Sequence, residues 1–314
     1  MNYKFEDVEV EECGYFDEYV YDIEIGDETH SFIANDILVH NSIYVSFEDA
    51  IKSCNWDKPG VEFILKLYEY RLSDYIEKGF EKYAKQYNTE NIQKLELEKI
   101  AESAIILAKK KYALDLIWKD PGVYFEPQTK ISSKGVEIVQ SSTPTFVRKH
   151  LKELLEILFQ EKSNLNIKAF VNKLKDTKEK FKLCDIEDIS FSRSISDYEK
   201  YIIEDRKQLK IASKCPIHVR AGGVYNYKLN NSKWKKKYQL IRSGDKIRYY
   251  HTKSYNEIEN IFAYQPGNYP YEIAPDIDYD LQFAKTIIDP INRFVVAMGF
   301  GKIPENLITS NRLF

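Results

Sequence analysis

The first forty residues contain three short stretches that predict β-strands. Residues 19–25 alternate as a half-buried strand does, and residues 26–28 (Gly-Asp-Glu) follow as a turn. Residues 30–34 and 37–39 predict two more strands, separated by a tight turn at residues 35–36 (Asn-Asp), since both residue types tolerate a positive φ. The pattern by itself predicts a small β meander and assigns it no function.

The rest of the chain mixes strand and helix patterns. Residues 42–47 alternate as a strand, and residues 95–107 fit either a helix or a strand. A helix is predicted after Pro59-Gly60, because apolar residues follow at helical spacing. These apolar positions are Val61, Ile64, Leu65, Tyr68, Leu72, Tyr75, Ile76 and Phe80.

Another helix is predicted to begin at residues 142–144, with Thr143 as its N-cap and Pro144 in its first turn. Its apolar stripe is Val147, Leu151, Leu154, Leu155 and Leu158. Glycine and proline residues within 216–223 and 266–270 separate further short elements. The chain as a whole is therefore predicted to be an α+β protein.

Charge divides the chain into two parts. Residues 1–41 carry twelve acidic residues and one basic residue, Lys4, whereas residues 42–314 carry 45 basic and 37 acidic residues. An acidic head on a basic body indicates different partners for the two parts. An acidic solubilising tail would also be charged, but the head is rich in Tyr, Phe, Ile and Val, which disordered tails lack.

Composition excludes several protein classes. No apolar run approaches the roughly 20 residues that span a bilayer, and the acidic N-terminus is unlike a signal peptide. The cysteines, Cys13, Cys54, Cys184 and Cys215, are scattered and form no CxxC pair, which favours reduced thiols in a cytoplasm. At 314 residues the chain is long enough for two or three domains.

Reactive residues add chemistry to the first segment. Residues 20–42 (VYDIEIGDETHSFIANDILVHNS) resemble the C-terminal block of an intein, which ends on His40-Asn41 before a hydroxyl nucleophile, Ser42. The tripeptide alone occurs often by chance, whereas the whole block, with Asp22 and His30 upstream, is specific. The resemblance implies a small all-β intein fragment of the HINT type, and splicing chemistry that needs no cofactor.

The resemblance also implies a role for each residue. Ser42 Oγ attacks an acyl group at the upstream splice junction, and Asn41 then cyclises onto its own carbonyl and cuts the chain. His40 assists as a proton donor, because imidazole titrates near neutral pH. Asp22 and His30 coordinate the steps and handle protons, although each also fits a structural polar residue. An initiating methionine lies forty residues before Asn41, so we expect a split intein whose other half is on a partner chain.

From Ser42 onward the sequence resembles family B DNA polymerases, most closely those of T-even-type phages. Residues 42–45 (SIYV) resemble the strand that continues after the two aspartates of the YxDTDS motif, and residues 108–114 (AKKKYAL) resemble the KKRY motif. Residues 134–144 resemble the passage from palm to thumb, and residues 215–220 (CPIHVR) resemble a thumb segment that lies along DNA. Each stretch alone is weak evidence for the family, but the four stretches in this order and at this spacing are a specific signal.

The resemblance implies that DNA phosphates meet a basic surface. Its candidate DNA-binding residues are Lys109, Lys110, Lys111 and Tyr112, followed by Lys134, His218 and Arg220. Lys111 stands where arginine is common, which keeps the charge but loses bidentate geometry. The basic run at residues 233–238 (KWKKKY) is interpreted as a solvated thumb surface. No metal ligand is predicted here, because the Mg²⁺-binding aspartates of the assembled polymerase are expected on the partner chain.

The last residues, 308–314, resemble the tail by which phage polymerases bind a sliding clamp. Leu313 and Phe314 are the candidate contacts, since two apolar residues at a free end fit a preformed pocket. A frayed terminus is the alternative, because the tail lacks a hydrophobic residue in its middle.

Together these features predict an intein segment (1–41), a mixed palm remainder (42–139) and a largely helical thumb with a clamp-binding tail (140–314). The predicted function is that of a C-terminal precursor fragment of a split DNA polymerase. Its partners would be the N-terminal polymerase fragment with the N-intein, primer–template DNA, dNTPs and a sliding clamp, with no membrane. Two alternatives remain: a non-catalytic DNA-binding or processivity subunit that keeps its acidic head, and a self-processing domain with another passenger.

Overall fold

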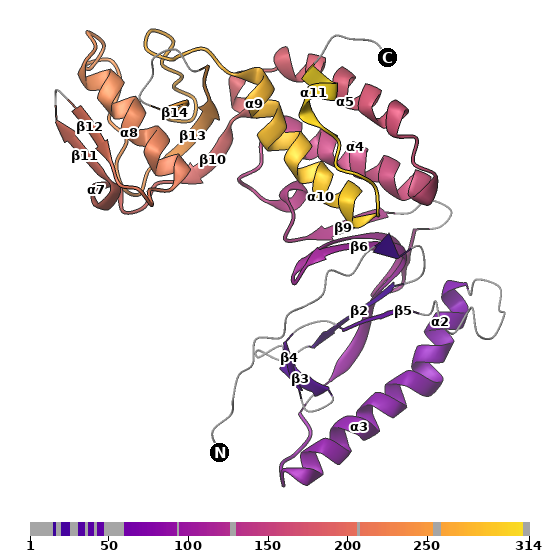
Figure 1. The fold of residues 1–314 in the computed structure, drawn as a ribbon. Helices are drawn as coiled ribbons and strands as arrows, with labels where there is room; N and C mark the ends of the chain where they lie inside the picture. The colour runs from indigo at the N-terminus through magenta and orange to yellow at the C-terminus, as the bar shows by residue number, and fades with distance from the viewer. Residues whose placement is uncertain are drawn as a thin grey trace. The chain divides into compact units, whose positions relative to one another are not determined.

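The computed structural model describes residues 15–16, 20–25, 31–34, 37–40, 43–46, 60–92, 94–125, 130–205, 208–253 and 259–309. The chain divides into two compact units (Figure 1). The first unit comprises Met1–Lys134 with Ala297–Gly299, and the second comprises Gly135–Val296 with Phe300–Phe314. The division lies near the predicted palm–thumb boundary at 139–140, while residues 1–41 share the first unit with the predicted palm.

An antiparallel sheet forms the centre of the first unit. Its long strands β6 (Leu95–Ala108) and β7 (Lys111–Lys119) pair along most of their lengths. Strands β8 (Val123–Tyr124) and β9 (Lys130–Lys134) pair with β7, and β1 (Tyr15–Phe16) pairs with β6. Residues 112–118 are buried without alternation, which explains why apolar pattern alone is ambiguous in this hairpin. The structure resolves 95–107 as a strand.

The strands predicted in the first forty residues are present. Strand β2 (Val20–Ile25) lies between β6 and β5 (Ile43–Ser46) in the main sheet, whereas β3 (Ser31–Ala34) and β4 (Ile37–His40) pair with each other. The segment therefore does not form one separate meander, because β2 hydrogen-bonds to strands on the far side of Ser42. An intein-type fold of this segment stays a prediction.

A helical segment packs against this sheet. It comprises α2 (Val61–Leu67), a π-helical turn (Tyr68–Leu72) and α3 (Ser73–Gln86), which confirms the predicted helix. Val61 and Ile64 are buried against the sheet residues Leu97, Ile100, Ile117 and Trp118. The predicted stripe is buried only at its start, since Tyr75 on α3 is 78% exposed.

The second unit combines helices with two small antiparallel sheets. Its longer helices are α4 (Thr145–Glu161), α5 (Ile167–Lys182), α8 (Ile217–Asn230) and α10 (Asp289–Ala297). Its short helices are α6 (Ile186–Ile189), α7 (Tyr198–Tyr201), α9 (Tyr279–Phe283) and α11 (Glu305–Thr309), and a π-helical turn (Ala284–Ile288) joins α9 to α10. The stripe predicted on α4 is buried, as expected. The predicted N-cap is wrong, because Pro144 occupies that position and no side chain caps the helix.

The sheets of the second unit pack on α8. Strands β10 (Phe191–Ser194), β13 (Lys246–His251) and β14 (Ile261–Tyr264) form one sheet, and β11 (Ile202–Asp205) pairs with β12 (Gln208–Ile211). Val219, Val224 and Leu229 of α8 are buried in the same hydrophobic cluster as the inner residues of β13 and β14.

Two neighbouring glycines of α8 provide a test of this packing. A Cβ on Gly223 would lie 2.9 Å from Ile202 Cδ1, with two more Ile202 carbons at 3.3 Å, whereas a Cβ on Gly222 would first meet Ile241 at 3.4 Å. We expect Gly223→Ala to lower the free energy of unfolding by about 1–2 kcal/mol, because overpacking outweighs the gain of about 1 kcal/mol in helix propensity. Gly222→Ala, the matched control, should be neutral or stabilising in urea unfolding; equal effects would contradict the packing.

Candidate nucleic-acid interface

The predicted basic motif forms the turn of the β6–β7 hairpin. Ala108 pairs with Lys111, so Lys109 and Lys110 make the connection. The backbone of Lys110 has φ = 61°, in the left-handed region that costs a non-glycine residue roughly 1–2 kcal/mol. A lysine at this position is an unfavourable choice for the turn itself, which favours a role for its ammonium group.

Strand pairing brings Lys134 to the same end of the sheet. Lys134 is the last residue of β9 and lies opposite Tyr112, the neighbour of Lys111. Lys109, Lys110, Lys111 and Lys134 are all exposed. We call these four residues the lysine turn. The structure therefore unites two motifs that lie more than twenty residues apart in the sequence.

Tyr112 differs from its predicted role. Its side chain is only 5% exposed and packs with Ala101, Ala104, Leu114 and Leu116. The ring stabilises the hairpin that presents the lysines, so a contact of Tyr112 with DNA stays a prediction that the burial does not favour.

The remaining candidates, His218 and Arg220, lie in the second unit, on the first turn of α8. His218 is half-buried, and desolvation lowers the pKa of its imidazole, assisted by the positive charge of Arg193. A lowered pKa keeps the ring largely neutral at neutral pH. His218 would therefore contact a phosphate as a hydrogen-bond donor rather than as a cation.

Arg220 is engaged within its own unit. Its guanidinium donates to the carbonyl oxygen of Cys215 at 3.2 Å and pairs with Glu259 at 3.5 Å. These contacts tie the start of α8 to the preceding loop and offset the charge of the side chain. The predicted DNA contact by Arg220 stays a prediction, and the geometry gives this residue a structural role first.

Arg193 on β10 was missed by the sequence analysis. It is exposed, and its charge acts on both His218 and Tyr249. No motif marks it, because only the pairing of β10 with β13 (Arg193 opposite Ile247) places it near α8. Arg193 joins His218 as a candidate phosphate contact of the second unit.

Most of the splicing and clamp candidates lie beyond the part of the chain that the structure describes. His30, Asn41, Ser42, Leu313 and Phe314 lie outside the described residues. Asp22 and His40 are described as backbone only: Asp22 lies opposite Tyr44 and Lys99 in the main sheet, and His40 lies opposite Ser31.

The described residues offer no obvious metal site. Within the described ranges, no group of three or more His, Cys, Asp or Glu side chains is placed to hold an ion. Among the helices that the structure covers, none has both the length and the apolar character to cross a bilayer.

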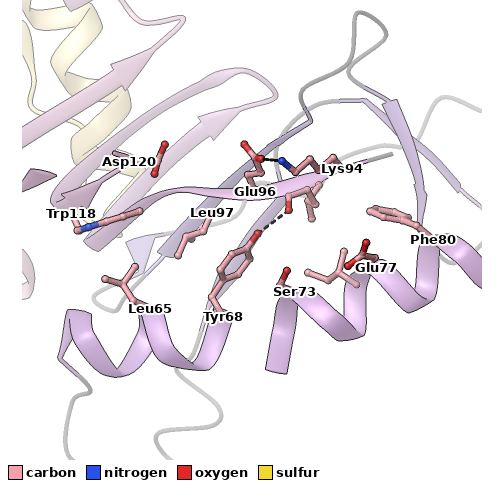
Figure 2. Close-up of a pocket in the computed structure, with 12 residues that line it drawn as sticks. Leu65, Tyr68, Ser73, Glu77, Phe80, Lys94, Glu96, Leu97, Trp118 and Asp120 are labelled. Atoms are coloured by element: carbon pink, nitrogen blue, oxygen red, sulfur yellow. Dashed lines mark hydrogen bonds and ion pairs between the residues drawn. The ribbon is translucent and has the colours of Figure 1, made fainter. Parts of the chain in front are cut away.

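A cavity of about 490 Å³ lies between the α2–α3 segment and strands β6 and β7 (Figure 2). Tyr68 crosses it and donates its hydroxyl to the Leu95 carbonyl oxygen at 2.8 Å, while Lys94 pairs with Glu96. Burial raises the pKa of Tyr68, so the phenol stays protonated at neutral pH. Within the described part of the chain, the Trp118 Nε1 in the same wall is buried without a hydrogen-bond partner, and no predicted site residue lines the cavity.

Comparison with known proteins decides the family. The family model for DNA polymerase family B matches residues 70–298, which is well over half of the chain. The chain belongs to DNA polymerase family B. The match includes the lysine turn, His218, Arg220 and Arg193, and it excludes residues 1–42 as well as Leu313 and Phe314.

Two phage proteins are similar to this family B chain, and both are named DNA-directed DNA polymerase. The protein of Escherichia phage RB69 is 25% identical over 278 residues, which is 82% of this chain and 29% of the relative. The protein of Enterobacteria phage T4 is 28% identical over 190 residues, which is 59% of this chain and 20% of the relative. The chain thus spans less than a third of these relatives, which supports the predicted likeness to a phage-type polymerase fragment.

Proposed function

We propose that this chain is the C-terminal part of a DNA-directed DNA polymerase that binds primer–template DNA through the lysine turn. The observation that carries the proposal is the position of this turn: four exposed cations at one end of a buried hairpin, inside the family match. Lysines of this kind neutralise phosphates without reading sequence, as template-directed synthesis requires. The name shared by the two phage relatives supports the activity.

The lysine turn makes a specific prediction about binding. Lys110→Ala and Lys110→Gly remove the same charge, but glycine relieves the cost of the left-handed backbone, whereas alanine keeps the Cβ that lysine has. Both variants should weaken binding of a primer–template duplex to the same extent and lower the salt slope by about one unit. Fluorescence anisotropy at several salt concentrations measures both quantities.

Lys119→Ala is the matched control, because Lys119 is exposed at the other end of the same strand. It should retain the affinity and the slope of the unmodified chain. Unchanged binding by both Lys110 variants would show that the lysine turn is an ordinary solvated surface that does not contact DNA. A loss confined to Lys110→Ala would instead indicate a distorted hairpin.

We further propose that residues 1–41 are the C-terminal half of a split intein, supported by the order Asp22, His30, His40, Asn41 and Ser42. The Ser42 hydroxyl attacks the acyl carbon at the upstream junction, and the displaced nucleophile takes up its proton. The Asn41 side-chain nitrogen then attacks the Asn41 carbonyl carbon, gives up one proton and closes a succinimide, while the departing Ser42 nitrogen takes a proton from His40. The resulting free amine attacks the ester carbonyl carbon, and the proton that the amine loses returns to the released Ser42 hydroxyl oxygen.

The product of these steps joins Ser42 to the upstream part of the polymerase. In this proposal the partner supplies the N-terminal intein half, the aspartates that hold Mg²⁺ and most of the dNTP site. Leu313 and Phe314 would bind a sliding clamp through a hydrophobic pocket. In this proposal, neither the splicing reaction nor the binding of the clamp uses a metal ligand of this chain.

A non-catalytic DNA-binding subunit that keeps its acidic head is the second candidate, since the exposed cations of the lysine turn would bind DNA without any catalytic residue. Mass spectrometry distinguishes the two candidate functions. The sample is the chain purified from cells that produce it together with its partner. Loss of residues 1–41 and covalent attachment of Ser42 to new sequence are expected for splicing. An intact chain that still binds DNA would instead support the subunit.

A further inference from the structure

The basic run at residues 233–237 is held in a rigid turn rather than a loose loop. Trp234 donates its backbone N–H to Ser232 Oγ, and its carbonyl oxygen accepts from the Lys237 N–H at 2.8 Å. Trp234 packs against the hydrophobic core of the second unit, and Tyr238 is buried in that core. The two aromatic anchors leave Lys235 and Lys236 exposed between them, and Lys233 is exposed just before Trp234.

The charges of this turn are only partly offset within the protein. Glu272 accepts hydrogen bonds from Lys237 and Tyr238, which together lower the pKa of its carboxyl to about 2. Lys233 lies over the Trp234 ring at 5.2 Å from the ring centroid, but Lys235 and Lys236 make no ion pair with any residue that the structure describes. Holding these like charges in a short ordered turn is unfavourable unless an anion binds them.

An exposed aromatic ring stands beside this turn. Tyr271 is 80% exposed and directly precedes Glu272, whose carboxylate is fixed by Lys237 and Tyr238. Its ring meets the edge of Tyr269 at a centroid distance of 4.9 Å, and the Tyr269 hydroxyl bonds to the buried Tyr250. Tyr271 is therefore an exposed ring braced by Tyr269, and it adjoins Glu272, the residue that ties this segment to the basic turn through Lys237.

We propose that Lys235, Lys236 and Tyr271, named here the lysine–tyrosine patch, bind single-stranded DNA at a site separate from the lysine turn. Lysines that track phosphates beside an aromatic ring that stacks on bases are the combination by which proteins bind unpaired strands. A duplex would use only the lysines, because its base faces are stacked on each other. The patch thus selects a strand with free bases.

Binding of a labelled oligothymidylate of about 12 nucleotides to the full chain tests the proposal by fluorescence anisotropy. The double variant Lys235→Ala/Lys236→Ala should lower the salt slope by about 1.4, since each single-strand phosphate contact contributes about 0.7. Tyr271→Ala should weaken binding roughly tenfold, and Tyr271→Phe should restore it because the ring is kept. Binding of a blunt duplex should change less than that of the single strand in each variant.

Matched controls come from the same protein. Lys168→Ala/Lys180→Ala removes two exposed charges from α5, and Tyr75→Ala removes another exposed ring, so both should bind the oligonucleotide normally. Unchanged single-strand binding by the patch variants would overturn the proposal. An equal loss for single strand and duplex would also overturn it, since it would leave only a general phosphate contact. A loss of duplex binding in the Lys110 variants alone would bear on the lysine turn and leave the patch untouched.

Discussion

The variant Asn41→Ala is expected to dock with the partner that carries the N-terminal intein half and yet release no intein. Splicing ends when the Asn41 side-chain nitrogen attacks its own carbonyl, and alanine has no such nitrogen. No other amide in the segment is adjacent to the Asn41–Ser42 bond. The expected result is complete loss of ligated product, measured on denaturing gels and by intact-mass spectrometry.

The intermediate that accumulates makes the test sharper. Ser42 is unchanged in Asn41→Ala, so the acyl transfer to its hydroxyl can still occur and leave a branched ester. This ester should be cleaved by hydroxylamine, whereas a ligated peptide bond should resist it. Ser42→Ala should block the earlier step and give no branched species. Asn2→Ala, which changes the same residue type outside the intein block, should splice normally.

Normal ligation by Asn41→Ala would refute the proposal that residues 1–41 are half of an intein. Docking without any branched or cleaved species, in both the unmodified chain and the variant, would identify a decayed intein. In either case the family assignment would stand, because the matched residues 70–298 lie entirely beyond the junction.

Local pattern predicted the elements well where one face of an element is buried and the other is not. The helix at 145–161 follows this rule, and the strands at 20–25 and 43–46 are present where their alternation predicted them. The pattern was ambiguous at 95–107, because the β6–β7 hairpin buries residues of both parities and loses the period of two. The N-cap was misplaced by one residue for a different reason: proline fixes its own φ and occupied the cap position itself.

The sequence predicted the positive charge of the candidate interface, but it did not predict which residues contact one another there. The lysine run at 109–111 was visible in the sequence, whereas the arrival of Lys134 beside it depends on the pairing of β7 with β9. Arg220 was predicted to face DNA, yet its ion pair with Glu259 joins residues 39 positions apart, which no local pattern reveals. Arg193 was missed for the same reason, since its neighbour His218 lies on a different element.

The chain alone is expected to have no nucleotidyl-transfer activity, and splicing is expected to switch it on. Polymerases place two metal ions with carboxylates to stabilise the attacking and leaving oxygens. In the proposal the carboxylates that hold these ions belong to the partner, and the described residues contain no group of three or more His, Cys, Asp or Glu side chains placed to hold an ion. Primer extension by the lone chain should therefore be indistinguishable from a reaction without protein.

The sheet of the first unit gives a second reason for this dependence. Strand β2 lies between β5 and β6, so the proposed splicing would remove an inner strand of the main sheet. Excision of residues 1–41 would free the facing edges of β5 and β6 and let the sheet close in its mature form. The partner mixed with Asn41→Ala would keep β2 in place, and it should extend primers far less than the ligated enzyme.

Three reactions therefore decide the last prediction: the lone chain, the chain with its partner, and Asn41→Ala with the partner. Only the second should extend primers efficiently, and its rate should rise in step with the ligated product seen by mass spectrometry. Efficient extension by the lone chain would refute the need for a partner. Equal extension in the second and third reactions would show that non-covalent assembly suffices, and that β2 does not obstruct the sheet. Because β2 contributes backbone hydrogen bonds on both of its edges, we expect its removal, and not docking alone, to limit activation.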